Sequence, residues 1–113
     1  MLPTAYKVVY EMLDLSLTSA TYMGKKAQYS TCEWTRPSEN NGPLAVFETL
    51  GHAVSWKKIQ GDPGLEIFEC EYVPAPHPCS VWVYYWDGLT RHFAKLPPGT
   101  VLAWSVKLLR RVV

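Results

Sequence analysis

Residues 44–63 read LAVFETLGHAVSWKKIQGDP, and this stretch decides the predicted fold. The apolar run 44–47 predicts a short buried strand. Thr49 is a good N-cap for a helix that runs to about Gln60. Gly61 suits the left-handed position after a helix, and the proline two residues later cannot continue one. The stretch therefore predicts a strand that leads directly into one amphipathic helix. The core-facing side of this helix is predicted to carry Leu50, Ala53 and Val54.

The segments on both sides of this unit alternate apolar and polar residues with a period of two, as strands do. Strands are predicted over residues 6–10, 27–34, 65–73, 80–86 and 89–95, and from Thr100 onward, where Leu102, Trp104, Val106 and Leu108 share one face. Residues 13–20 could form either a helical turn or a strand. Asp87-Gly88 is a strong signal for a hairpin. We therefore predict an α+β domain, in which one main helix, about 49–60, packs on one face of a twisted, mostly antiparallel sheet of five to seven strands.

The size and charge of the chain limit the classes of function. With 113 residues, the range 1–113 is expected to form a single domain. Eleven Lys and Arg balance ten Asp and Glu, so electrostatics do not favour duplex nucleic acid. No apolar run approaches the roughly twenty residues that span a bilayer, and the first residues lack the pattern of a secretory signal. The three cysteines are an odd number, which argues for reduced thiols. We therefore expect a cytoplasmic protein without membrane contact.

Sequence motifs for catalysis are not found. The chain carries no phosphate-binding glycine loop, no nucleophile elbow and no HExxH helix, so we predict no cofactor and identify no catalytic residue. The nearest set of metal ligands is Cys70, His77 and Cys79, but no fourth ligand accompanies it, and we predict no metal site. Cys32 could meet His52 or His92 only through tertiary folding.

A cluster of aromatic residues is the strongest functional signal. Trp82, Tyr84 and Trp86 share one parity of a predicted strand, and Arg91 and His92 follow across the hairpin. Such a mixture can stack on planar ligands or contact a protein partner. The same residues could instead form a hydrophobic core or a homodimer contact. We predict these five residues as the site of ligand or partner binding.

The order of several motifs supports a resemblance. They are AYKVV (5–9), GPLAVFETLGHA (42–53), LEIFECE (65–71) and GTVLA (99–103). Together they resemble a group of small uncharacterised proteins from phages, prophages and other mobile elements. The resemblance implies a compact α+β domain and no established activity. In addition, the Val-Phe strand, the Thr-capped helix and the Glu-rich strand are similar to part of the ADP-ribosyltransferase-like fold.

Two functions are therefore expected. The first is a small non-enzymatic binding or interaction module, which could be dimeric and which contacts a protein partner or small ligand through the hairpin 80–95. The alternative, implied by the local similarity, is a small ADP-ribosyltransferase-like enzyme with a cleft beside the helix. An enzyme should show a pocket of roughly 300 Å³ or more with converging polar groups of shifted pKa.

Overall fold

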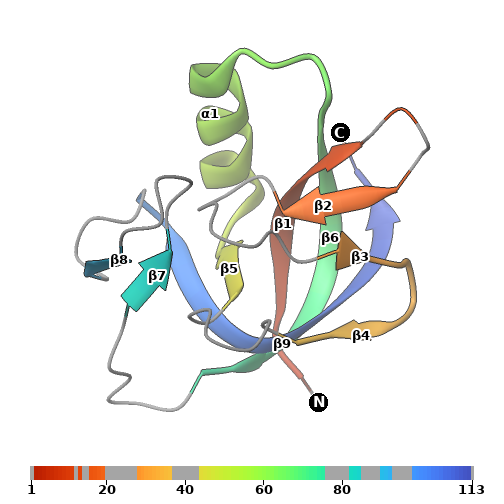
Figure 1. Ribbon diagram of the computed structural model, residues 1–113, viewed down its shortest axis with the longest axis vertical. Coiled ribbons are helices and arrows are strands. Elements are labelled where there is room, and N and C mark those ends of the chain that lie inside the picture. Colours follow the sequence, from red (N-terminus) through yellow and green to blue (C-terminus); the bar gives the residue numbers. More distant parts are fainter. Residues whose placement is uncertain are drawn as a thin grey trace.

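The computed structural model describes residues 2–11, 13, 16–19, 28–36, 44–75, 82–84, 90–92 and 98–112. The chain forms nine strands and one helix within these residues (Figure 1). In chain order they are β1 (Thr4–Glu11), β2 (Leu17–Ser19), β3 (Gln28–Tyr29), β4 (Trp34–Thr35), β5 (Leu44–Phe47), α1 (Leu50–Gln60), β6 (Leu65–Pro74), β7 (Trp82–Tyr84), β8 (Thr90–His92) and β9 (Thr100–Arg111).

Four of the strands close into a barrel in which all neighbours run antiparallel. β6 pairs with β1 along one edge and with β9 along the other, and β5 bridges β1 and β9 on the far side. β2 and β3 continue the wall from β1, and β4 adds to β9. The predicted α+β fold, a twisted, mostly antiparallel sheet with one main helix packed on one face, was therefore wrong: the protein is mostly β-structure built around a closed barrel. A period of two is the same in an open and in a closed sheet, so alternation alone could not reveal the closure.

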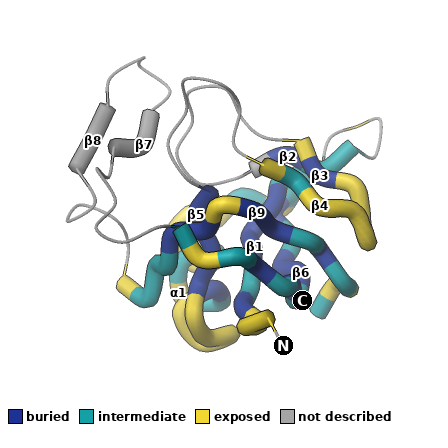
Figure 2. Tube along the Cα trace, turned by 90° about the horizontal axis from the view of Figure 1, so that it is seen from below, coloured by how far each residue is buried: buried dark blue, intermediate teal, exposed yellow. Residues whose placement is uncertain are grey.

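Residues on the two faces of the barrel strands belong to two different apolar clusters. The larger cluster fills the barrel and includes Ala5, Val9, Val46, Phe68, Cys70, Ala103, Val106 and Leu108. The smaller cluster joins the outer side of the wall to the helix and consists of Val8, Phe47, Ala53, Leu65 and Ile67. Both faces of β6 are thus covered, as its sequence predicted. Figure 2 shows buried residues concentrated on the barrel strands and exposed residues on the outer turns of α1.

The limits of the helix are as predicted, but its buried face is narrower. Thr49 is the N-cap, and Gly61 ends the helix with a φ of 66°. Ala53 is completely buried, whereas Leu50, predicted to face the core, is 36% exposed. Trp56 instead contacts Phe47, with their ring centroids 5.9 Å apart.

Two strands depart from the predicted pattern. The strand predicted over 27–34 is divided into β3 and β4 by a turn in which Cys32 has a φ of 65°. In β9, the register shifts where Val73 pairs with Ser105 and the next residue of β6 pairs with Ala103. The extra residue at this bulge is Trp104, which is 50% exposed although it was predicted to share a face with buried neighbours.

Candidate functional site

The predicted aromatic site lies on a hairpin that is separate from the barrel sheet. β7 and β8 form a two-stranded antiparallel sheet of their own (Figure 1). Trp82 pairs with His92 and Tyr84 pairs with Thr90, so a hairpin joins the strands as predicted. Arg91 is paired with Val83, in a different row from the two aromatic residues. Trp86 lies outside the described residues.

The hairpin register also differs from the one that a two-residue Asp87-Gly88 turn would give. With that turn, Tyr84 would pair with Arg91. The observed partner of Tyr84 is Thr90, which is one residue earlier. The backbone register therefore pairs His92 with Trp82 and Arg91 with Val83.

A lysine buried inside the barrel is the most unusual polar group in the structure. Lys7 is 1% exposed and shares its parity on β1 with Ala5 and Val9, which belong to the interior cluster. Its Nζ donates a hydrogen bond of 2.6 Å to the carbonyl oxygen of Ala45 on β5. The same nitrogen lies 5.6 Å from the centre of the Tyr29 ring. The barrel interior therefore contains a buried amine.

Burial changes the protonation of this amine and of a neighbouring thiol. The loss of hydration lowers the pKa of Lys7 from 10.5 to about 7, although its interaction with Cys70 acts in the opposite direction. The loss of hydration raises the pKa of Cys70 from 9.0 to about 12, against the effect of Lys7. Burial also raises the pKa of Tyr72, and the charge of Glu48 adds to the increase. At neutral pH, the amine can therefore be neutral while the thiol keeps its proton.

Sequence reasoning did not identify Lys7 as a functional candidate. The only signal was its parity, because Lys7 alternates in step with Ala5 and Val9 between outward residues such as Tyr6 and Val8. A lysine within a strand normally marks the solvent side, since its charged form is costly to bury. Only the closure of the barrel shows that this parity faces inward.

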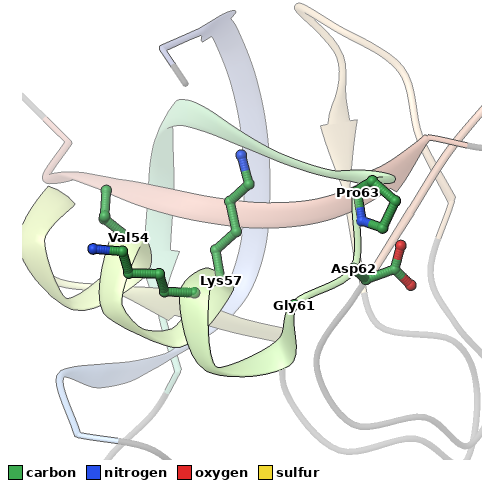
Figure 3. Close-up of a pocket in the computed structure, with 6 residues that line it drawn as sticks. Val54, Lys57, Gly61, Asp62 and Pro63 are labelled. Atoms are coloured by element: carbon green, nitrogen blue, oxygen red, sulfur yellow. The ribbon is translucent and has the colours of Figure 1, made fainter.

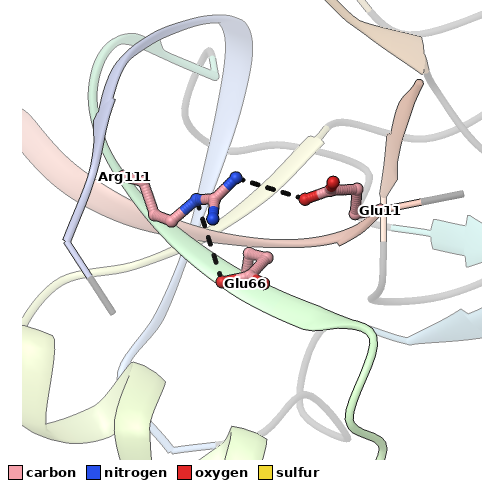
Figure 4. A network of polar contacts seen from close by, with 3 residues as sticks. All are labelled: Glu11, Glu66 and Arg111. Atoms are coloured by element: carbon pink, nitrogen blue, oxygen red, sulfur yellow. Dashed lines mark hydrogen bonds and ion pairs between the residues drawn. The ribbon is translucent and has the colours of Figure 1, made fainter. Parts of the chain in front are cut away.

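An ionic cluster joins the ends of three strands (Figure 4). The guanidinium of Arg111, at the end of β9, lies 3.2 Å from the carboxylate of Glu11 on β1 and 3.9 Å from that of Glu66 on β6. A second pair joins Arg110 to Glu69 at 3.1 Å. The arginine side chains are more than half exposed, so these pairs are expected to contribute little to stability. They are surface contacts between neighbouring strands.

A pocket of about 380 Å³ lies at the end of α1 (Figure 3). It is lined by Val54, Lys57, Lys58, Gly61, Asp62 and Pro63. The Asp62 carboxylate accepts a hydrogen bond of 2.9 Å from the Gly64 amide, so it serves the turn that leads into β6. The groups with shifted pKa, Lys7, Cys70 and Tyr72, belong to the barrel and do not line this pocket. The pocket has the size expected for an enzyme, but it is separate from the buried amine and thiol of the barrel.

Of the remaining candidates, the structure describes Cys70, Cys32 and His52. Cys70 is buried in the barrel, while His77 and Cys79 lie outside the described residues. Cys32 is exposed, and the Nδ1 atom of His52 lies 2.7 Å from the Thr49 hydroxyl. In the described part of the chain, no three His, Cys, Asp or Glu side chains gather as metal ligands would.

Two further observations concern the whole chain. In the part that the structure describes, no helix is long and apolar enough to cross a membrane. Comparison of the chain with protein families, curated proteins and solved structures finds no match.

Proposed function

We propose that this protein is a small binding module that presents the hairpin of β7 and β8 to a protein partner. The observation that carries the proposal is that these two strands pair with each other and form a sheet separate from the barrel. The hairpin therefore adds no hydrogen-bonded strand to the barrel wall.

The physical chemistry of hairpins supports this proposal. A lone two-stranded hairpin is marginally stable in water and needs a surface against which to pack. Its sequence carries Trp82, Tyr84 and Trp86, together with Arg91 and His92. Trp, Tyr and Arg are the residue types that contribute most to binding energy at protein interfaces. A partner surface, or a second copy of this chain in a homodimer, would supply the packing.

The enzyme alternative has less support. The pocket beside α1 is separate from the buried amine and thiol, so the features expected of a catalytic cleft are divided between two places. Among the described residues, Cys32 and Cys70 are free thiols, which fits the reducing cytoplasm in which we place the protein. An origin in a mobile element, suggested by the sequence motifs, stays a prediction.

The test compares a hairpin variant with a matched barrel variant. Trp82→Ser combined with Tyr84→Ser removes two aromatic rings from the hairpin. Trp34→Ser removes a 44% exposed tryptophan from β4 and serves as the control. Sedimentation of the purified proteins over a range of concentrations measures self-association. Affinity capture identifies other protein partners, and the dissociation constant of each captured partner is then measured for all three proteins.

We expect the hairpin variant to lose an association that the wild type and the Trp34 variant share, while its thermal unfolding is unchanged. Loss of barrel stability in the hairpin variant would show that these rings belong to the core. Equal association by all three proteins would show that binding, if any, uses another surface. Either result would overturn the proposal.

A further inference from the structure

The barrel has one short seam, and Lys7 lies beside it. β1 and β6 are paired over seven residues, but the described pairing of β1 with β5 is a single pair, Tyr6 with Phe47. If this register continued, Val8 would pair with Ala45. Instead, β1 turns away to pair with β2, beginning at Val9, and β5 stays with β9. The strands thus fork directly after the single pair.

The side chain of Lys7 bridges this fork from within. It extends from β1 and donates its 2.6 Å hydrogen bond to the Ala45 carbonyl on β5. Two residues further along, the main chain of β1 is paired with β2. The amine therefore provides a link between β1 and β5 where the described backbone pairing ends.

The interior around this amine is poor in charged groups within the described residues. Tyr29 from β3 and Cys70 and Tyr72 from β6 are its titratable members. The charge of Glu69 raises the pKa of Cys70, and the charge of Glu48 raises that of Tyr72. The other strands contribute apolar side chains, namely Leu17, Leu44, Val46, Ala103, Val106 and Leu108. A cation in such surroundings loses much of its hydration energy.

We propose that Lys7 is a proton-operated latch on the β1–β5 seam: its neutral amine holds the seam closed, and proton uptake favours an open state in which the amine reaches water. The seam is the place where opening breaks the fewest described strand pairs. Because β5 leads directly into α1, the latch controls how firmly residues 44–60 are held against the barrel. A latch that opens on proton uptake requires a closed state that disfavours the charged amine, and the lowered pKa of Lys7 agrees with this.

The pH range follows from linkage. In the open state, Lys7 would regain its ordinary pKa of 10.5, whereas in the closed state its pKa is about 7. Between these values, opening takes up one proton, so the equilibrium constant for opening falls about tenfold for each unit by which the pH rises. Below pH 7, both states hold the proton and the dependence ends.

Hydrogen exchange followed by mass spectrometry tests the latch on the full chain. Exchange at pH 6, 7, 8 and 9, corrected for the intrinsic rate, is compared between residues 44–60 and residues 65–74. In the wild type, we expect protection of 44–60 to rise by up to about 50-fold from pH 7 to pH 9 and by only about twofold from pH 6 to pH 7, with a smaller rise in 65–74. Lys7→Met should abolish the dependence, and Lys7→Arg should keep 44–60 poorly protected at every pH.

Lys107→Met, which changes a lysine on the outer side of β9, is the matched control and should behave as the wild type does. If a Lys7 variant does not fold, the comparison of the two segments in the wild type still decides the outcome. A pH-independent protection of 44–60 would overturn the proposal. So would an equal rise in both segments, or a dependence that persists in Lys7→Met.

Discussion

Gly99 and Gly61 both have left-handed backbone conformations but very different surroundings. Gly99 has a φ of 80°, and a Cβ added there would lie 2.3 Å from Cγ and 2.7 Å from Cβ of His52. Its carbonyl also accepts a hydrogen bond of 2.8 Å from the Glu48 amide. Gly61 has a φ of 66°, with open space where a Cβ would be placed. Comparing substitutions at the two glycines therefore distinguishes the cost of backbone strain from the cost of a steric clash.

We expect Gly61→Ala to lower the free energy of unfolding by about 1 kcal/mol, because an L-residue is strained at this φ. Gly99→Ala should cost roughly 1–3 kcal/mol more, because the His52 ring is held close to its own backbone and cannot move away freely. Urea unfolding of both variants and the wild type measures the difference. Equal losses in the two variants would contradict the close packing of Gly99 on His52.

At the scale of the elements, α1 depends strongly on its first turn. Within the helix, Ala53 is the one fully buried residue, so packing alone supports it weakly. The Thr49 hydroxyl accepts a hydrogen bond of 3.2 Å from the His52 amide and lies 2.7 Å from Nδ1 of the same residue. At the other end, the Gly61 amide donates to the Lys57 carbonyl, and two lysines complement the helix dipole. Local contacts thus contribute much of what holds the helix.

Thr49→Ala should therefore destabilise the protein by about 1 kcal/mol, the usual cost of losing an N-cap hydroxyl. Thr49→Ser keeps the hydroxyl and should retain most of the stability. Chemical unfolding monitored by circular dichroism compares the two. If Thr49→Ser loses as much as Thr49→Ala, the effect arises from the methyl group and the capping interpretation is wrong.

At the scale of the whole molecule, the buried amine should make stability depend on pH. Between pH 7 and pH 10.5, the unfolded chain carries a proton on Lys7 that the folded chain lacks. The free energy of unfolding should therefore rise with pH in this range. Below pH 7, the contribution of Lys7 to it should be low and constant. Cys70 acts in the opposite direction above pH 9, because its folded pKa is about 12 and the unfolded thiol ionises first. The contribution of Lys7 is thus best separated between pH 7 and pH 9.

In that window, the wild type should gain up to about 1.4 kcal/mol per pH unit relative to Lys7→Met. At pH 7, the methionine variant should be the more stable protein, since it buries an apolar chain of similar length. Equilibrium unfolding in urea at pH 7, 8 and 9 provides the comparison, with Lys107→Met as the surface control. Parallel pH profiles for the wild type and Lys7→Met would show that the buried amine does not titrate in this range.

Local features could be predicted from the sequence because their causes are local. Thr49, Gly61 and the proline that follows determine where the helix begins and ends, and the observed limits of β5 and α1 agree with that prediction. The alternation of β6 likewise indicated two covered faces. For the hairpin, the presence of two paired strands was predicted, but their register was one residue different because it depends on the residues between them.

The sequence by itself thus determined the helix, its caps and most of the strands, since each follows from hydrogen bonding and side-chain periodicity within a few residues. Only the tertiary structure decided that β1, β5, β6 and β9 close into a barrel, that Trp104 lies on a bulge, and that the inward parity of β1 includes Lys7. These features depend on which distant strands pair and on which side then becomes the interior. A strand has the same period of two whether its lysine faces water or the centre of a barrel.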